Sequence, residues 1–372
     1  MGIERGRISS SQAVALIATI VGPTAILTGV TPLIAQAKQD AWIGGLLLIL
    51  YGIVIVWLAA GLTLRFPGKT LLEIVTLLLG RPARWLLGGL YTWWLLHVTA
   101  VIVREMGEFA LSAMLPRTPI MVIMGSLLVV VVFAVRGGLE VIARATQFVF
   151  PLMPLLIMGI ILLAFPDFQL ENLLPLLQEG FRPIVQGAFP LAGFFGEFVV
   201  AALAIFPFVA DRGGIIASGI LAVVLIGLFT ILAAVSSIAL LGPALAAQQT
   251  FPFVRVVRFV ALAEFLERLD PMLILAWFFG IAIKVMIWFY ALVLTAAHWL
   301  NLSDYRPLTF PFAVIVLGLA QLLHDSVTDL SAFIVTTWTP YATVFELLIP
   351  FGLWLLSSFQ ARPDPSTGLE AS

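Results

Sequence analysis

The sequence contains no cysteine and only three histidines among its 372 residues. The lack of thiols excludes disulfide bonds, thiolate metal sites and thiol catalysis. With only three histidines, we do not expect a histidine-based metal cluster. The sequence also shows no nucleophile–base set, metal-binding motif or nucleotide-binding motif. These absences predict a protein that is not an enzyme and that needs no metal or other cofactor.

Charged residues are also scarce. They make up 10% of the chain, whereas a soluble globular protein carries roughly 25%. Hydrophobic residues make up 62%, and the mean hydropathy is +1.13. No soluble core can bury this much apolar surface, so the composition predicts an all-α, multi-pass membrane protein. The formal net charge of −1 gives no reason to expect a nucleic-acid partner.

The apolar segments predict ten spanning helices. A spanning helix needs about 20 apolar residues, and the apolar run after the polar N-terminus is too long for a signal-peptide core, so we expect it to be retained. The tail at 361–372 is expected to be short and cytoplasmic. The predicted helices lie near residues 11–36, 41–64, 85–114, 119–136, 141–165, 183–208, 214–241, 271–299, 308–323 and 337–359.

Lysine and arginine are unevenly distributed between the loops of the two sides. The loops on the same side as the N-terminus carry more of them, and the acidic segment at 167–179 falls on the opposite side. Because positively charged loops stay in the cytoplasm, we expect both termini to be cytoplasmic.

Ten helices divide into two groups of five, residues 1–180 and residues 181–360. Helices 1 and 6 then occupy corresponding positions, and both are interrupted, in "ATIVGPTAILTG" and in "GAFPLAGFFGEFVV". Corresponding interruptions in two halves indicate an inverted-repeat transporter fold with its binding site at the bilayer midplane. An odd number of helices in each half makes the second half enter the membrane from the opposite side, so the repeat is inverted.

The two interruptions predict a site for a small ligand. Each alone is compatible with a simple kink, because proline and glycine are common in membrane helices. Together they favour broken helices whose free N–H groups face an anion such as a carboxylate. The predicted substrate-binding residues are Gly22, Pro23, Thr24, Thr28 and Gly29 in helix 1 and Gly193, Phe194, Gly196 and Glu197 in helix 6.

Ionisable residues near the middle of their helices are a second group of candidates. Glu197, Lys284 and Glu346 lie at a common expected depth, where a charge needs a partner or water. They are expected to form a buried ion or proton cluster, or alternatively a structural ion pair between helices. In helix 3, the spacing of Arg104 and Glu108 favours a local ion pair, whereas Glu105 is rotated by roughly 100° from Arg104 and is free to face an aqueous cavity.

The order and spacing of several segments resemble a known family. They include "ISSSQAVALIATIVGPTAILTGVTPLIAQAKQDAWIGG", "RFPGKTLLEIVTLLLGRP", "VIVREMGEFALSAMLPRTP", "FAVRGGLEVIARATQ", "DFQLENLLPLLQEGFRPIVQGAFPLAGFFGE" and "FLERLDPMLILAWFFGIAIKV". Together these segments resemble the spore germination permeases, the B subunits of nutrient germinant receptors, within the amino acid–polyamine–organocation superfamily. The resemblance runs from about residue 8 to residue 308 and weakens over the last two helices. The positions that match the family are Gly22, Glu105, Glu108, Glu197 and Lys284, whereas Pro23 departs from it, because similar sequences more often have a small polar residue there.

The resemblance implies a LeuT-like fold of ten helices in a five-plus-five inverted repeat, with a nutrient bound between broken helices 1 and 6. It also implies an inner membrane location in the spore and partner subunits of the A and C types. The nutrient implied is an amino acid, or in some relatives a sugar or nucleoside. Two alternatives share this scaffold: a secondary-active amino acid transporter and a ligand-gated ion or water channel.

Overall fold

The computed structural model describes Glu4 and residues 6–113, 115–262 and 269–359. The expected tail at 361–372 lies outside these residues. The α-helices are α1 Ser10–Thr24, α2 Val30–Ala37, α3 Ala41–Arg65, α4 Leu71–Ala113, α5 Ile120–Arg136, α6 Leu139–Val149, α7 Leu152–Ala164, α8 Arg182–Gly196, α9 Val200–Ala204, α10 Ile215–Leu241, α11 Pro243–Ala247, α12 Pro252–Leu262, α13 Leu269–Trp299, α14 Thr309–Leu322, α15 Val327–Phe333, α16 Thr339–Thr343 and α17 Ile349–Phe359.

The expectation of an all-helical membrane protein is confirmed. Within the described residues, seven helical stretches are long and apolar enough to cross a bilayer, and α5 and α14 are shorter apolar helices. The first stretch, Ser10–Arg65, contains two of the expected spans, and it turns at Lys38, which has φ +50°. The number of membrane crossings stays a prediction, because length and composition alone do not fix where the bilayer begins and ends.

Several helix boundaries follow from local sequence. A capping box starts α1, because Ser9 Oγ accepts the N–H of Gln12 and the Gln12 side chain accepts the N–H of Ser9. Gly80 bends α4 through its φ of +81°, a conformation that glycine adopts at little cost. The backbone at Gly80 is not helical, so α4 consists of two helices that meet at a kink, and the spacer "LGRPAR" separates them as expected.

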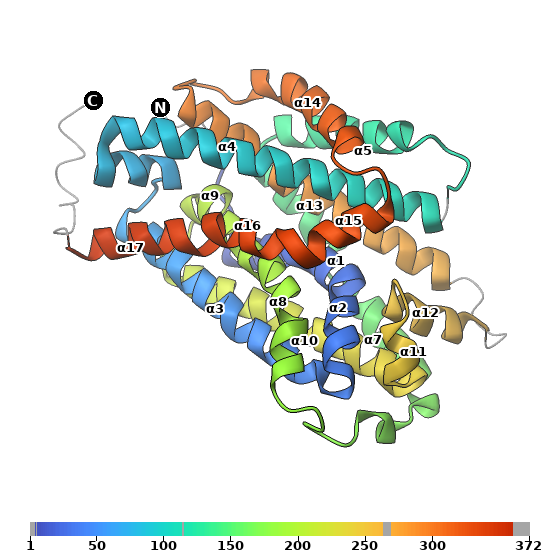
Figure 1. The fold of residues 1–372 in the computed structure, drawn as a ribbon. Coiled ribbons are helices and arrows are strands. Elements are labelled where there is room, and N and C mark those ends of the chain that lie inside the picture. The colour runs from blue at the N-terminus through green and yellow to red at the C-terminus, as the bar shows by residue number, and fades with distance from the viewer. Residues whose placement is uncertain (1–3, 5, 114, 263–268, 360–372) are drawn as a thin grey trace.

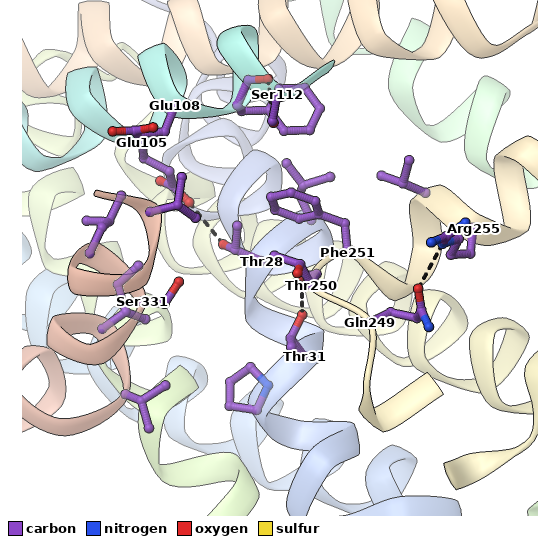
Figure 2. Close-up of a pocket in the computed structure, with 18 of the residues that line it drawn as sticks. Thr28, Thr31, Glu105, Glu108, Ser112, Gln249, Thr250, Phe251, Arg255 and Ser331 are labelled. Atoms are coloured by element: carbon purple, nitrogen blue, oxygen red, sulfur yellow. Dashed lines mark hydrogen bonds between the residues drawn. The ribbon is translucent and has the colours of Figure 1, made fainter. Parts of the chain in front are cut away.

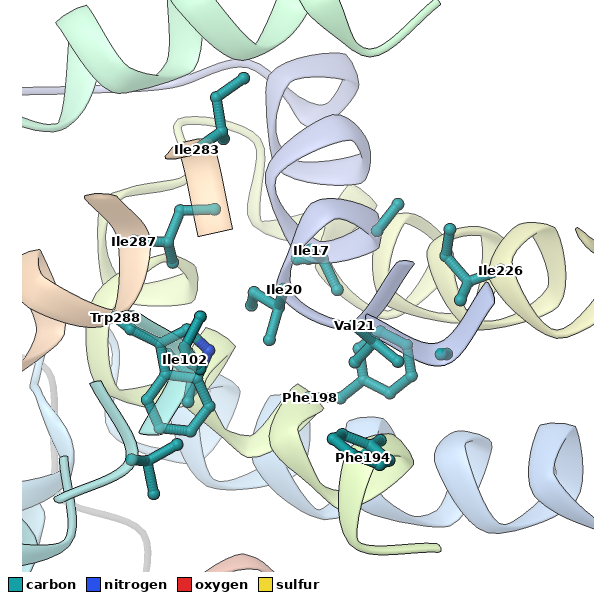
Figure 3. Close-up of a cluster of buried hydrophobic side chains, with 14 of the residues drawn as sticks. Ile17, Ile20, Val21, Ile102, Phe194, Phe198, Ile226, Ile283, Ile287 and Trp288 are labelled. Carbon is teal, nitrogen blue, oxygen red and sulfur yellow. The ribbon is translucent and has the colours of Figure 1, made fainter. Parts of the chain in front are cut away.

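The long helices α3, α4, α10 and α13 cross the molecule in different directions, with shorter helices packed among them (Figure 1). The helix α4 and the series α15 to α17 each extend across the molecule and contact one another, while α3 lies against α8 and α10. Figure 3 shows the apolar centre, where Ile20 of α1, Trp288 of α13 and Phe198 next to α8 meet. Because lipid is as apolar as these side chains, helix association in a membrane depends on close packing and polar contacts.

Candidate functional site

Helix 1 is irregular where the sequence predicted a break, but it does not unwind. The stretch Ala25–Gly29 between α1 and α2 is a π-helix, and the N–H of Ala25 still bonds to the carbonyls of Val21 and Gly22. Other side chains satisfy the displaced carbonyls. Trp277 Nε1 donates to the Pro23 oxygen at 2.8 Å, and the Thr28 hydroxyl donates to the Thr24 oxygen at 2.9 Å. The expected break is therefore a widened turn, since its freed acceptors are occupied.

Helix 6 is likewise continuous. A short 3-10 turn, Glu197–Val199, joins α8 to α9. The Thr339 hydroxyl of α16 donates to the Pro190 carbonyl at 2.9 Å and accepts the N–H of Gly193 at 3.2 Å. A side chain from the last helical series thus bonds to the backbone at this irregularity of α8, and the predicted break of helix 6 is not confirmed.

The glycines of both helices serve close packing in this structure. A Cβ atom added at Gly193 would lie 2.6 Å from Trp338 Nε1, and one added at Gly196 would overlap the Glu346 side chain. In helix 1, Gly22 faces Ile226 and Gly29 faces Leu191. The open faces that the sequence indicated as a ligand cradle are filled by side chains of neighbouring helices.

Lys284 of α13 lies between helices 1 and 6, as its central position suggested. It is fully buried, and its Nζ is 2.8 Å from Glu197 Oε2 and 2.7 Å from the Thr24 hydroxyl oxygen. The ammonium also lies 5.7 Å from the centre of the Phe194 ring, within the range of a cation–π contact. Three of the residues predicted from the two interruptions therefore surround one buried cation.

Glu346 is buried beside this group. Its side chain packs against the backbone of Gly196, and neither carboxyl oxygen has a hydrogen-bond partner among the described residues. The residue lies in a π-helical stretch, Val344–Leu348, between α16 and α17. The three ionisable residues that were expected at a common depth thus lie near the place where α1, the end of α8 and the stretch Val344–Leu348 meet.

In α4, Arg104 and Glu108 form the ion pair that their spacing favours, with Arg104 Nη2 2.7 Å from Glu108 Oε1. Arg104 also donates to the carbonyls of Ala320 and Gln321, at 3.3 Å each, near the end of α14. A guanidinium suits this position, because the last carbonyls of a helix carry partial negative charge. The pair therefore links α4 to α14.

Glu105, one position along, faces a different environment. Its side chain lines a cavity of about 440 Å³, together with Thr28, Glu108 and Phe109. Figure 2 shows the Thr28 hydroxyl directed at the Glu105 carboxyl group, to which it donates at 3.0 Å. The sequence expectation that Glu105 faces a cavity holds in the structure. Gly22, Pro23, Thr24, Gly193, Phe194, Gly196 and Glu197 do not line this cavity.

Two walls of the cavity were missed from the sequence. One is formed by α12 and the segment before it, including Gln249, Thr250 and Arg255, and the other by α15 with Ser331. Arg255 Nε donates to Gln249 Oε1 at 2.8 Å, and the Thr31 hydroxyl donates to the Thr250 carbonyl at 2.8 Å (Figure 2). The helix α12 is too short for a span of about 20 residues, so a search for spanning helices passes over it; its alternation of basic and apolar residues was the available signal.

Comparisons with known proteins show which family the chain belongs to. Residues 7–328 match the model of a family described as spore germination protein. The chain is 29% identical over 375 residues to spore germination protein KB of Bacillus subtilis (strain 168), covering 99% of this chain and 100% of the relative. It is 24% identical to spore germination protein XB of Bacillus anthracis, covering 72% of this chain and 75% of that protein.

A solved structure supports the fold. The crystal structure of MhsT in complex with L-phenylalanine matches with a TM-score of 0.59 at 16% identity, covering 95% of this chain and 96% of that one. This similarity confirms the expected LeuT-like fold, although helices 1 and 6 are continuous here. The apolar helices and the family match together show a multi-pass membrane protein with a permease-like fold. The chain belongs to the spore germination protein family.

Proposed function

We propose that this chain is the permease-like, nutrient-sensing subunit of a spore germinant receptor. In this proposal it lies in the inner membrane of the spore with both termini in the cytoplasm, and it works with A-type and C-type partner subunits. The nutrient is a small molecule, an amino acid, that binds from the cavity lined by Thr28 and Glu105. Membership of the family and the fold shared with a protein solved with L-phenylalanine support this assignment.

A continuous set of polar contacts between the cavity and the buried charges carries the proposal. The Thr28 hydroxyl lies 3.0 Å from the Glu105 carboxyl group in the cavity and 2.9 Å from the Thr24 carbonyl, and these two acceptors share its single proton. The Thr24 side chain contacts Lys284, which pairs with Glu197. A ligand that rearranges Thr28 therefore acts on the contact between the segments 1–180 and 181–360, which we propose to be the two repeats. Differential binding to two arrangements of these repeats shifts their populations.

The residues predicted as one ligand site then have two roles. Glu105 contacts the ligand and Thr28 orients the Glu105 carboxyl group, whereas Thr24, Phe194, Glu197 and Lys284 transmit the binding of the ligand. Gly22, Gly29, Gly193 and Gly196 are positions where helices pack closely and move against one another. Glu346 packs against Gly196, and the ion pair of Arg104 and Glu108 links α4 to α14.

A secondary-active amino acid transporter is the second candidate function. The buried group of Lys284, Glu197 and Glu346 favours it, because ionisable residues inside membrane helices commonly mark ion or proton pathways. In that case the same cavity opens alternately to the two sides of the membrane.

Purified full-length chain in proteoliposomes separates the two functions. A receptor subunit is expected to bind an amino acid without accumulating it, and to co-purify with two partner proteins from spores. Sustained uptake of labelled amino acid by the chain alone would instead establish a transporter, and an amino acid-triggered ion or water flux would establish a channel. The failure of every amino acid to bind would reject both the receptor and the transporter proposals.

A further inference from the structure

Glu105 and Glu108 both line the cavity, but only Glu108 forms an ion pair among the described residues. The side chain of Glu105 is only 6% exposed, and in the described part of the chain its carboxyl group forms no ion pair; its hydrogen-bond donor is Thr28. A buried carboxylate without a partner is destabilised by several kcal/mol. The position therefore favours a positive group that arrives from the cavity.

The neighbouring acidic groups are already paired, and two arginines also line the cavity: Arg255, which donates to the neutral Gln249 side chain, and Arg258. Glu108 pairs with Arg104, and Glu197 pairs with Lys284. Lys284 Nζ is directed to Thr24 and Glu197, and it does not line the cavity. A cation that enters the cavity thus finds a buried acidic group that forms no ion pair with the described residues, although the charge of Lys284 acts on it from a distance.

Apolar side chains surround this polar group. Leu27, Phe109, Leu330 and Ile334 line the same cavity, whose volume of about 440 Å³ lies within the range of small-molecule sites. Such walls suit an apolar side chain, whereas Glu105 and Thr28 provide a negative group and a hydroxyl at one place.

We propose that Glu105, oriented by Thr28, binds the ammonium group of an apolar α-amino acid in this cavity. The inference rests on the proposed function and adds to it the position of the ligand's amine. It moves the ligand from the interruption of helix 1 at Gly22 and Pro23 toward the wall formed by α4, α12 and α15. Glu105 contacts the ligand, and Thr28 is a positioning residue that orients the Glu105 carboxyl group.

The experiment compares ligands with and without the amine. Purified full-length protein is titrated with L-alanine, L-valine, L-leucine and L-phenylalanine, and the tightest of these is compared with its des-amino carboxylic acid. The wild-type protein is expected to prefer the amine. In Glu105→Gln this preference is expected to fall by about 10- to 100-fold, the range for a hydrogen bond to a charged group. Thr28→Val is expected to reduce the same preference less.

The ratio of the two ligand affinities distinguishes the loss of a direct contact from damage to the fold. A deformed cavity weakens both ligands equally, so an equal loss in Glu105→Gln, or no loss, would overturn the inference while leaving nutrient sensing intact. Glu171→Gln, at an exposed position, is the matched control and should change neither ligand. If none of the four amino acids binds the wild-type protein but another amino acid does, this inference fails and the proposed function stands.

Discussion

At the scale of single residues, Lys284 shows how a charge is accommodated inside a membrane protein. It has a carboxylate and a hydroxyl within 2.8 Å, together with the nearby aromatic ring of Phe194. Each partner removes part of the free-energy penalty for burying an ammonium group. If one charged partner is removed, the other stays buried without compensation. Breaking a buried ion pair destabilises a protein by about 3–5 kcal/mol, whereas replacing both partners with apolar side chains is often tolerated.

We therefore expect Lys284→Met to lower the thermal stability of the protein in detergent more than the double variant Lys284→Met/Glu197→Met. The single variant leaves the Glu197 carboxylate buried without a cation, at a cost of about 3–5 kcal/mol, and the double variant removes both charges. Unfolding is followed by tryptophan fluorescence. A double variant that loses as much stability as the sum of the two single variants would show that the two residues do not act as a pair.

The sequence predicted which residues matter here better than it predicted their contacts. An ionisable residue in an apolar run is conspicuous, so Glu197, Lys284 and Glu346 were found from the sequence alone. Their partners depend on how each helix is rotated, which a nearly uniform apolar sequence does not reveal. The contact between Lys284 and Thr24 joins residues 260 positions apart, and only the packed helices bring them together.

At the scale of helices, the interruptions in helices 1 and 6 have a different explanation from the one the sequence favoured. Glycine and proline in an apolar run indicate either an unwound segment or a place where another helix approaches closely. Both meanings give the same sequence pattern. In this structure Thr339, Trp338 and Glu346 fill the space beside α8, so the second meaning applies. The last helical series also starts at Val327, ten residues before its predicted start at 337, because Ser326 caps it.

Gly196→Ala tests this packing. A methyl group at Gly196 would overlap Glu346, and overpacking of this kind destabilises a protein by about 1–3 kcal/mol. The matched control is Gly318→Ala in α14, where an added Cβ has no neighbour within 4 Å. That variant is expected to be neutral or stabilising by up to about 1 kcal/mol, because alanine favours helix more than glycine does.

Thermal unfolding of both glycine variants is measured in the same detergent. In the double variant Gly196→Ala/Glu346→Ala, the side chain at position 346 is too short to overlap the new methyl group. The double variant should therefore recover part of the lost stability. Equal stability of Gly196→Ala and Gly318→Ala would contradict the packing role and would return Gly196 to the list of candidate ligand contacts.

At the scale of the whole molecule, a strap at the N-terminus connects parts of the chain that are distant in sequence. Ile8 exchanges backbone hydrogen bonds with the segment after α9, donating to Phe208 and accepting from Ala210. The Glu4 carboxylate accepts from the hydroxyls of Tyr290 and Tyr305, at 3.1 and 3.2 Å. Burial, followed by the nearby Glu4 carboxylate, raises the pKa of the Tyr305 hydroxyl, so this hydroxyl keeps its proton and stays a donor.

These contacts join the start of helix 1 to the end of helix 6, to α13 and to the loop before α14. Any movement of helix 1 against the second half of the chain must therefore break them. We expect the strap to hold this end of the molecule closed. The sequence marked the N-terminus only as polar, because a strap of this kind has no periodic pattern and depends entirely on its distant partners.

The absence of native cysteine makes the strap directly testable. A single cysteine at Ala13, a buried position in α1, is expected to react slowly with a water-soluble maleimide in the otherwise wild-type protein. Glu4→Ala removes the hydrogen bonds that the carboxylate accepts from the hydroxyls of Tyr290 and Tyr305 and from the N–H groups of Gly6 and Leu139, and it should raise the labelling rate by about tenfold or more. A cysteine at Ala246, buried in α11, is the control. A similar rise at both positions would indicate general loosening, and no rise at Ala13 would show that the strap does not close this end of the molecule.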